Sequence, residues 1–222
     1  MDRILFGAPE LRTLEAALAT DEDGLSSRGL GRPITDRRTS WVRSVEIGSN
    51  IYYIKTYDYP TWRARLRGTL RNTGPARPSR AAREAAAARW LRAHGFEAPL
   101  PVAVLERRRL GFLSRAVLVT RAWPGEPVDR ILRGLGEEAR RSLCEELFAF
   151  VARLHRAGFR DRNLDLRNLL ARPIEGGWQF AKLDSPRFRL RRPGNARDSL
   201  ARADWTRLRE QLQASGVLAI SP

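Results

Sequence analysis

The sequence predicts an α+β fold, on three observations. Its 222 residues suffice for one domain or for two small lobes that share a cleft. Residues 41–123 are rich in strand-like segments, so we expect an antiparallel sheet with one helix there. Residues 124–222 are mainly helical in pattern, and the weakly patterned residues 1–40 are expected to form a peripheral leader.

The first predicted elements are a helix and a hairpin. Residues 9–20 of the leader have the pattern of an amphipathic helix. A hairpin is predicted from alternating apolar residues over 41–47, a Gly-Ser-Asn turn, and a β-branched and aromatic run over 51–57. Lys55 lies in the second strand of this hairpin.

A second helix is predicted between two sets of chain-breaking residues. Gly and Pro interrupt the chain at 74–78, Ser79 can cap a helix, and an alanine-rich sequence then runs to His94 and stops at Gly95. Glu84 falls in the second turn of this helix.

Two strands and two helices complete the prediction. Strand-like residues cover 102–106 and 116–121, and residues 123–125 are expected to form a hinge. Apolar residues at intervals of four, four and three then indicate a core helix that Gly158 closes, and a final helix is expected over 198–214. The apolar positions are Leu143, Leu147, Val151 and Leu154 in the core helix, and Ala201, Trp205, Leu208 and Leu212 in the final helix.

The composition combines globular character with an unusual positive charge. The chain has 41 Lys and Arg against 25 Asp and Glu, a formal net charge of +16, and its only lysines are Lys55 and Lys182. This charge favours nucleic acid, anionic lipid headgroups or phosphorylated substrates as partners without choosing among them, although an arginine skew also follows from genomic base composition. The two lysines are candidates for positions that require a compact ammonium.

Several classes of protein are excluded. No apolar stretch approaches the roughly 18 residues that cross a bilayer, so we expect no transmembrane segment. The single cysteine, Cys144, cannot form an internal disulfide, and no apolar secretory core follows Met1, which together favour the cytoplasm. One cysteine and two distant histidines do not make a zinc site, and no nucleic-acid-binding motif is present.

The order of polar residues along the predicted elements is typical of phosphoryl transfer. Lys55 lies on a strand, Glu84 on a helix, Asn168 at the end of a polar loop, and Asp184 directly after a strand over 178–183. Kinases use a lysine to hold nucleotide phosphates, a glutamate to hold that lysine, and an asparagine and an aspartate to hold magnesium. Each residue alone has an ordinary structural interpretation, but the ordered set indicates a kinase-like site.

The residues around Asn168 carry a specific resemblance. The segments LHRAGF (154–159), DRNLDLRNLL (161–170) and KLD (182–184) resemble the catalytic segment of the bacterial lipopolysaccharide core kinases, the Kdo and heptose kinase family. The likeness extends upstream to residues 53–55 and covers residues 38–212. It implies a two-lobed protein-kinase-like fold with a reduced C-terminal lobe, divided into residues 41–123 and 124–222.

The resemblance also implies roles for individual residues. Lys55 would contact the α- and β-phosphates of ATP, and Glu84 would pair with Lys55. Asn168 and Asp184 would coordinate Mg²⁺. The residues that would line the adenine are Val119, Arg121 and Trp123.

Two features depart from the kinase pattern. The hairpin before Lys55 contains only Gly48 and no G-x-G-x-x-G loop. The catalytic base, an aspartate five residues before the metal-binding asparagine, is replaced by Asn163, whose amide cannot accept a proton. Loss of a general base costs about 10²- to 10⁴-fold in rate, although phosphoryl transfer depends more on positioning and charge neutralisation.

Asp165, two positions after Asn163, is the candidate for a substitute base or for orienting the acceptor. The alternative is that its carboxylate is solvated in the loop or caps the turn that follows. After Asp184, Pro186 restricts the chain, and a run of four arginines over 187–192 forms either a solvated face or a contact for a phosphorylated sugar or an anionic headgroup.

Two functions follow from these expectations. The resemblance implies an ATP- and Mg²⁺-dependent kinase that phosphorylates a sugar hydroxyl of the lipopolysaccharide inner core, Kdo or heptose. Its acceptor would be a lipid-linked saccharide, and the protein would lie peripherally on the anionic cytoplasmic face of the inner membrane. Asn163 favours the alternative, a catalytically impaired pseudokinase that acts as a scaffold or regulator in envelope saccharide synthesis.

Overall fold

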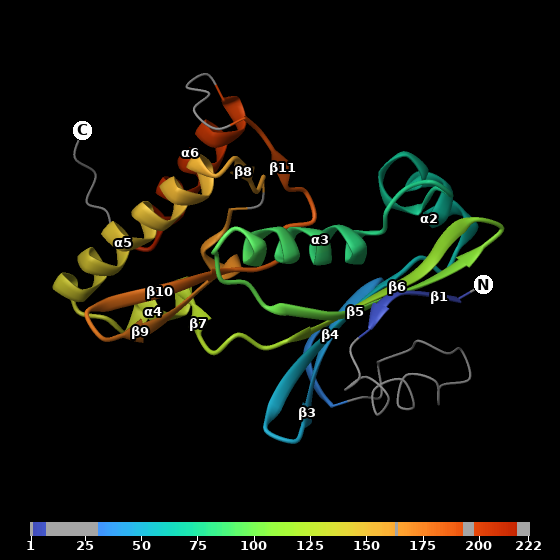
Figure 1. The fold of residues 1–222 in the computed structure, drawn as a ribbon, viewed down its shortest axis with the longest axis horizontal. Coiled ribbons are helices and arrows are strands. Elements are labelled where there is room, and N and C mark those ends of the chain that lie inside the picture. The colour runs from blue at the N-terminus through green and yellow to red at the C-terminus, as the bar shows by residue number, and fades with distance from the viewer. Residues whose placement is uncertain (1, 8–30, 163, 193–197, 217–222) are drawn as a thin grey trace. The chain divides into compact units, whose positions relative to one another are not determined.

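The computed structural model describes residues 2–7, 31–162, 164–192 and 198–216 (Figure 1). The chain divides into two compact units, which we call the first unit (residues 1–89 and 99–122) and the second unit (residues 90–98 and 123–222). The amphipathic helix expected over residues 9–20 lies outside the described residues.

The first unit is built on a six-stranded antiparallel sheet with the strand order β1-β5-β6-β4-β3-β2. Its strands are β1 (Asp2–Gly7), β2 (Arg32–Arg37), β3 (Ser40–Ile47), β4 (Asn50–Asp58), β5 (Leu100–Arg109) and β6 (Phe112–Arg121). The predicted hairpin and the two later strands are confirmed, each strand extending one to four residues beyond its predicted range at one or both ends. Within residues 1–40, expected to form a peripheral leader, β1 pairs with β5 and β2 pairs with β3, so these two strands form the edges of the sheet.

The two faces of this sheet carry separate apolar clusters. Tyr52 and Ile54 of β4 are buried on one face together with Val119 of β6. Tyr57 is buried on the other face, against Ala81 and Ala85 of helix α3 (Arg80–Ala93). The period-two alternation of a strand therefore places Lys55 on the face that α3 covers.

Helix α3 begins where the sequence predicts. The Ser79 hydroxyl accepts a hydrogen bond from the Ala82 amide at 3.0 Å, which satisfies one of the unpaired donors of the first turn. Gly95, just after the helix, has a φ of 77° and thereby ends it. Between β4 and α3 lie a short helix α2 (Trp62–Arg67) and a π-helical turn η2 (Thr69–Thr73).

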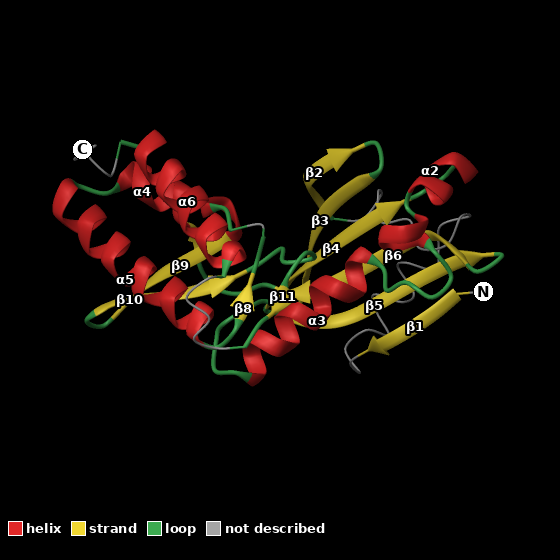
Figure 2. Cartoon of the chain, turned by 90° about the horizontal axis from the view of Figure 1, so that it is seen from above, coloured by secondary structure: helices red, strands yellow, loops and turns green. Residues whose placement is uncertain are grey.

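The second unit packs helices against a small sheet (Figure 2). Strands β9 (Leu169–Ile174) and β10 (Gly177–Lys182) form a hairpin that β7 (Glu126–Pro127) extends, and β8 (Phe159–Arg160) pairs with β11 (Arg189–Leu190). The helices are α4 (Val128–Gly134), α5 (Glu137–Arg156) and α6 (Ser199–Ala214), with a 3-10 turn η3 (Leu166–Asn168).

Helix α5 is the predicted core helix. Its four predicted apolar positions, Leu143, Leu147, Val151 and Leu154, are all buried. Gly158 has a φ of 91° after the helix, and a Cβ there would lie 2.3 Å from the Arg191 carbonyl oxygen, so the position requires glycine.

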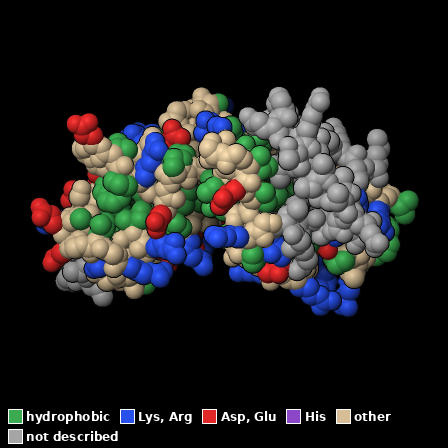
Figure 3. Space-filling view, turned by 90° about the horizontal axis from the view of Figure 1, so that it is seen from below, with side chains coloured by type: hydrophobic (Ala, Val, Ile, Leu, Met, Phe, Trp, Pro, Cys, Tyr) green, Lys and Arg blue, Asp and Glu red, His purple; other side chains and the backbone are tan. Residues whose placement is uncertain are grey.

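The surface reflects the charge of the chain. Lys and Arg side chains are spread along the face shown in Figure 3 rather than gathered in one patch. None of the helices in the described residues is both long enough and apolar enough to span a bilayer.

Candidate functional site

Lys55 and Glu84 form an ion pair inside the first unit. The Lys55 Nζ lies 3.0 Å from Glu84 Oε2, and Glu84 is almost fully buried beneath the sheet. Tyr57 donates its hydroxyl to Glu84 Oε1, and Arg80 Nε lies 3.4 Å from the same oxygen. Because three donors converge on one buried carboxylate, the Lys55 ammonium is held at a fixed place on the sheet.

The register of β6 shows which of its residues share a face with Lys55. Lys55 pairs across the sheet with Leu118, whereas Val119 pairs with Ile54 and is fully buried in the cluster on the opposite face, because cross-strand partners share a face. Contact of Val119 with adenine stays a prediction. Leu118 and Thr120 point to the same side as Lys55.

Arg121 and Trp123 each have surroundings of their own. Arg121 pairs with Tyr52, so it shares the face of Val119. Trp123 belongs to the second unit, where its ring packs on Leu170 and Ala181 and its indole Nε1 donates to Glu97 Oε2 at 3.1 Å. Contact of either residue with adenine stays a prediction.

Asn168 and Asp184 lie at the same end of the β9–β10 hairpin in the second unit. Asn168 directly precedes β9, and its carbonyl oxygen accepts the Leu183 amide at 3.0 Å, next to Asp184. Asp184 has a φ of 56°, a left-handed conformation that an aspartate adopts at a cost. The hairpin thus brings together the two residues expected to bind a metal.

The chemistry of this donor pair fits magnesium. Mg²⁺ is usually held by one or two protein carboxylates together with waters and substrate phosphates. Asp184 provides one carboxylate and Asn168 one amide oxygen. Among the described residues, no group of three or more His, Cys, Asp or Glu side chains is arranged to hold a metal ion by itself.

Lys182 forms a buried ion pair that connects this end of the hairpin to the preceding loop. Its Nζ lies 2.9 Å from Asp161 Oδ2, and both side chains are excluded from solvent. The same ammonium donates to the carbonyl oxygens of Asn168 and Leu183. Burial raises the pKa of Asp161 above its ordinary value, although the ammonium opposes the shift. Lys182 therefore occupies a position that a planar guanidinium would fit poorly.

Asp204 of helix α6 holds the loop backbone from the other side. Its two carboxylate oxygens accept the amides of Asp161 and Arg162, each at 3.1 Å, and His155 Nε2 lies 3.3 Å from Oδ2. Arg162 has a φ of 58°. Because this conformation is unfavourable for arginine, the hydrogen bonds that the Asp161 and Arg162 amides donate to the Asp204 carboxylate account for its persistence.

Two further contacts of α6 fix the ends of the loop. Gln211 accepts the Leu166 amide at 2.9 Å and donates to the Leu164 carbonyl at 3.4 Å. Asp198, at the start of α6, caps the helix and accepts Arg160 Nε at 2.7 Å. Burial would raise the pKa of Asp198, but the Arg160 guanidinium and the capping amides outweigh it and lower that pKa.

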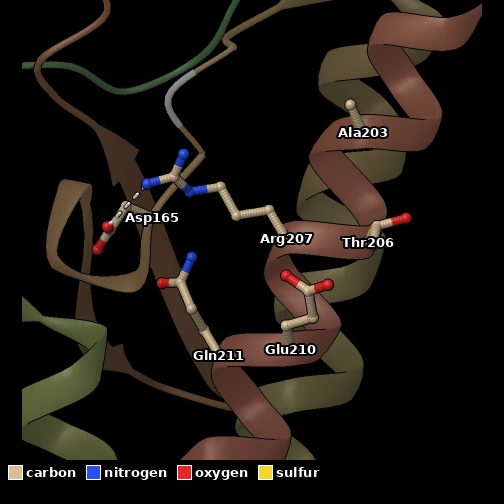
Figure 4. Close-up of a pocket in the computed structure, with 6 residues that line it drawn as sticks. All are labelled: Asp165, Ala203, Thr206, Arg207, Glu210 and Gln211. Atoms are coloured by element: carbon tan, nitrogen blue, oxygen red, sulfur yellow. Dashed lines mark ion pairs between the residues drawn. The ribbon is translucent and has the colours of Figure 1, made fainter.

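Asp165 lies in the wall of a pocket of about 620 Å³ on the second unit (Figure 4). Its carboxylate accepts both Arg167 Nε and Nη2, at 3.0 and 2.9 Å, and Arg207 Nη2 lies 3.5 Å away. It also accepts the Arg167 amide, and so caps η3. The Arg167 hydrogen bonds lower the pKa of Asp165 to about 2.

This geometry favours the capping alternative for Asp165. A carboxylate with a pKa near 2 is a weak base, and its oxygens are already engaged by two guanidinium groups and a backbone amide. Asn163, the residue at the usual base position, lies outside the described residues.

Comparisons with known proteins identify the family of the chain and a structure with a similar fold. The model of the phosphotransferase enzyme family (APH) matches residues 48–219. The chain belongs to this phosphotransferase family. Its fold is similar to that in the structure of WaaP in complex with acyl carrier protein, with a TM-score of 0.63, 18% sequence identity, and coverage of 94% of this chain and 80% of that chain. No curated protein matches it in sequence. The expected protein-kinase-like fold is confirmed.

Two residues that hold the loop of the candidate site were missed in the sequence. Asp204 and Gln211 lie on the same face of α6 as the apolar residues Leu208 and Leu212, so their positions were hidden by the helical pattern. The signal is an acidic residue at a core position of an amphipathic helix, which requires a buried partner.

The arginine run after Asp184 is exposed, which is compatible with both a solvated face and a contact for a phosphorylated sugar or an anionic headgroup. Arg187, Arg189 and Arg191 are exposed, while Phe188 turns inward and stacks on Phe159 with ring centroids 5.5 Å apart. Leu190 is also exposed, so only one of the two apolar residues in the run packs against the second unit.

Proposed function

We propose that the chain is an ATP- and Mg²⁺-dependent kinase that phosphorylates a sugar hydroxyl of the lipopolysaccharide inner core, Kdo or heptose. The observation that carries the proposal is the ion pair between Lys55 and the buried Glu84, at 3.0 Å, in a member of a phosphotransferase family. Such a pair fixes an ammonium so that it can hold the nucleotide phosphates. Leu118 and Thr120, on the same face as Lys55, are proposed to line the adenine, and contact of the buried Val119 with adenine stays a prediction.

Asn168 and Asp184 are the proposed metal-binding residues. When bound, Mg²⁺ would neutralise charge on the phosphates of the nucleotide. The contribution of the chain itself is to fix both donors. The hydrogen bond from the Leu183 amide to the Asn168 carbonyl oxygen holds the two strands in register, and the Lys182 ammonium bridges the same backbone.

The two carboxylates of the loop are both engaged by cations, so neither is assigned to proton removal from the acceptor. Asp165 is engaged by arginines, and Asp161 is used in the ion pair with Lys182. The rate enhancement is therefore assigned to positioning of the two substrates and to charge stabilisation of the transferring phosphoryl group, because these two effects lower the barrier to phosphoryl transfer more than proton removal does.

The acceptor is proposed to be an anionic, lipid-linked saccharide at the cytoplasmic face of the inner membrane. Arg167 is 73% exposed and Arg207 is half exposed, and the guanidinium groups of both form ion pairs with Asp165. Guanidinium groups bind carboxylates and phosphates through paired hydrogen bonds, so these residues suit an acidic sugar or a phosphorylated one.

The experiment is a thermal shift with ATP and Mg²⁺ followed by an ATP-consumption assay on Kdo- and heptose-containing acceptors. The proposal expects both stabilisation by the nucleotide and acceptor-dependent turnover, each lost in Lys55→Met. Arg133→Met, which removes an exposed cation on α4, is the control and retains both. If ATP is not consumed with any of these acceptors, the proposed kinase function is refuted.

The second candidate is a pseudokinase that acts as a scaffold or regulator in envelope saccharide synthesis. The observation that favours it is that Asp165, the candidate base, is bound by Arg167 and Arg207 and caps η3. Stabilisation by ATP without consumption on any of these acceptors would support this function over the first.

A further inference from the structure

The segment between β4 and α3 exposes large apolar side chains. On α2 and η2, Trp62, Leu66 and Leu70 follow one another at intervals of four, and the exposed fractions of Leu66 and Leu70 are 59% and 83%. Trp62 and Leu66, four residues apart, lie along one side of α2, and Leu70 follows in η2. The segment therefore presents an apolar stripe to the surroundings.

The polar contacts of this segment point inward instead. Arg65 is buried and donates to the carbonyl oxygens of Tyr59 and Pro60 at 2.9 and 3.1 Å. Thr69 and Thr73 donate their hydroxyls to the Arg65 carbonyl oxygen. A surface helix usually buries its apolar side chains and exposes its charged ones, but here Arg65 is buried while Leu66 and Leu70 are exposed.

The turn between β5 and β6 adds a further exposed leucine beside this segment. Leu110, at the tip of the turn, is 86% exposed. Arg108 ties the turn to the chain after η2, since its guanidinium donates to the carbonyl oxygens of Gly74, Arg77 and Gly111. The ring of Trp62 also packs edge-on against Phe112, 5.9 Å between centroids. These parts form one surface, which we call the Leu66–Leu110 surface.

The charge around this surface has a single sign. Between Asp58 and Glu84 the sequence contains seven arginines and no acidic residue. Arg63, Arg67 and Arg77 in that stretch are exposed. Exposed leucine and tryptophan within a cationic rim are typical of segments that lie in the headgroup region of a bilayer, with their apolar side chains inserted and their cations on anionic lipid.

We propose that the Leu66–Leu110 surface docks the protein on an anionic lipid bilayer. Single leucines that protrude from a turn and a short helix suit insertion between lipids better than they suit a shaped protein groove. The arginines provide attraction that falls with salt concentration, and the leucines provide attraction that does not. The proposal rests on the proposed function only in that a lipid-linked acceptor would lie in the same bilayer.

The test is co-sedimentation of the full chain with vesicles of phosphatidylcholine alone or mixed with phosphatidylglycerol, without nucleotide. We expect binding to the mixed vesicles only. Leu66→Ser with Leu70→Ser should weaken it by about tenfold or more, and Arg63→Gln with Arg67→Gln by a similar factor. All four side chains are exposed, so unchanged melting curves would show that the variants fold.

Matched controls come from the second unit. Ile174→Ser removes an exposed apolar residue, 49% exposed, and Arg130→Gln with Arg133→Gln removes two exposed cations from α4. Both should bind the mixed vesicles as the wild type does. Equal losses in the control and test variants would overturn the proposal, as would no binding to mixed vesicles.

A fluorescent label reports insertion directly. Cys144 is buried and its pKa is raised by burial to about 11, so a thiol-reactive environment-sensitive dye should label Leu70→Cys selectively. Emission should rise and shift to the blue on mixed vesicles. If the wild type self-associates and Leu66→Ser with Leu70→Ser does not, the surface binds a second copy of the chain. If the dye emission changes on addition of an acidic protein but not on addition of vesicles, the surface binds that protein. Either result overturns the proposal. Vesicle binding without ATP turnover would refute the proposed kinase function but leave the membrane-docking proposal standing.

Discussion

Lys182→Met should be among the most destabilising single substitutions in the second unit. The Lys182 and Asp161 side chains are 0% and 2% exposed, and their charged atoms are 2.9 Å apart. Removal of one partner of a buried ion pair leaves an uncompensated charge and costs about 3–5 kcal/mol. At about 2–4 °C per kcal/mol for a chain of this size, the melting temperature should fall by at least about 6 °C.

The pH dependence of this loss identifies its cause. Burial already raises the pKa of Asp161, and loss of the ammonium should raise it further. A carboxyl group destabilises the fold when its pKa is higher in the folded state than in the unfolded state. This destabilisation is complete at a pH above the folded-state pKa, and it disappears as the pH falls below the unfolded-state pKa of about 3.9. The difference between Lys182→Met and the wild type should therefore shrink as the solution is acidified.

Thermal unfolding followed by tryptophan fluorescence measures this difference. Arg133→Met is the matched control, because it removes an exposed ion pair with Asp129 at 3.0 Å and should cost about 1 kcal/mol or less. The double variant Lys182→Met with Asp161→Asn should recover part of the loss. A decrease under about 2 °C, or one that does not change with pH, would refute the assignment of a buried charge pair.

Three more predictions concern the site. Glu84→Gln should weaken ATP binding by about tenfold or more, measured by titration calorimetry, because Lys55 loses its anionic partner; unchanged affinity would argue against a phosphate-binding role. Asp204→Ala should lower the free energy of unfolding in urea by about 2–4 kcal/mol, because the backbone amides of Asp161 and Arg162 lose a charged acceptor, and a change below about 1 kcal/mol would contradict this. Asp165→Asn should leave phosphate transfer at neutral pH unchanged, whereas a loss of 10²-fold or more would restore Asp165 as base. In the wild type, the stabilisation from the lowered pKa of Asp165 is present above about pH 4 and should fade as the pH falls toward 2, when acid titration is followed by circular dichroism.

Local sequence signals were sufficient for most of the elements. The turn at 48–50, the capping Ser79 and the glycines at 95 and 158 each act within a few residues, so the hairpin, α3 and α5 could be predicted with their ends nearly correct. Strand β1 could not, because its pairing with β5 joins residues that lie about a hundred positions apart in the sequence.

The candidate site also combines features that were visible in the sequence with features that depend on tertiary contacts. The order of Lys55, Glu84, Asn168 and Asp184 along the chain was visible, and the structure brings each pair together within its own unit. Which residues of β6 share a face with Lys55 depends on the strand register, which the sequence does not show: Leu118 shares that face and Val119 lies on the opposite one. The buried role of Asp204 depends on tertiary contacts with a loop more than forty residues earlier.

The contacts of α6 also have a consequence for synthesis of the protein on the ribosome. The backbone of Asp161 and Leu166 emerges from the ribosome first. The side chains of Asp204 and Gln211, which hydrogen-bond to it, are translated about forty residues later, a delay of several seconds at typical elongation rates. Until then Arg162 has nothing to hold its left-handed conformation. A nascent chain that has not yet released α6 from the exit tunnel should therefore be unable to bind substrate, and chaperone engagement is expected to concentrate in that interval.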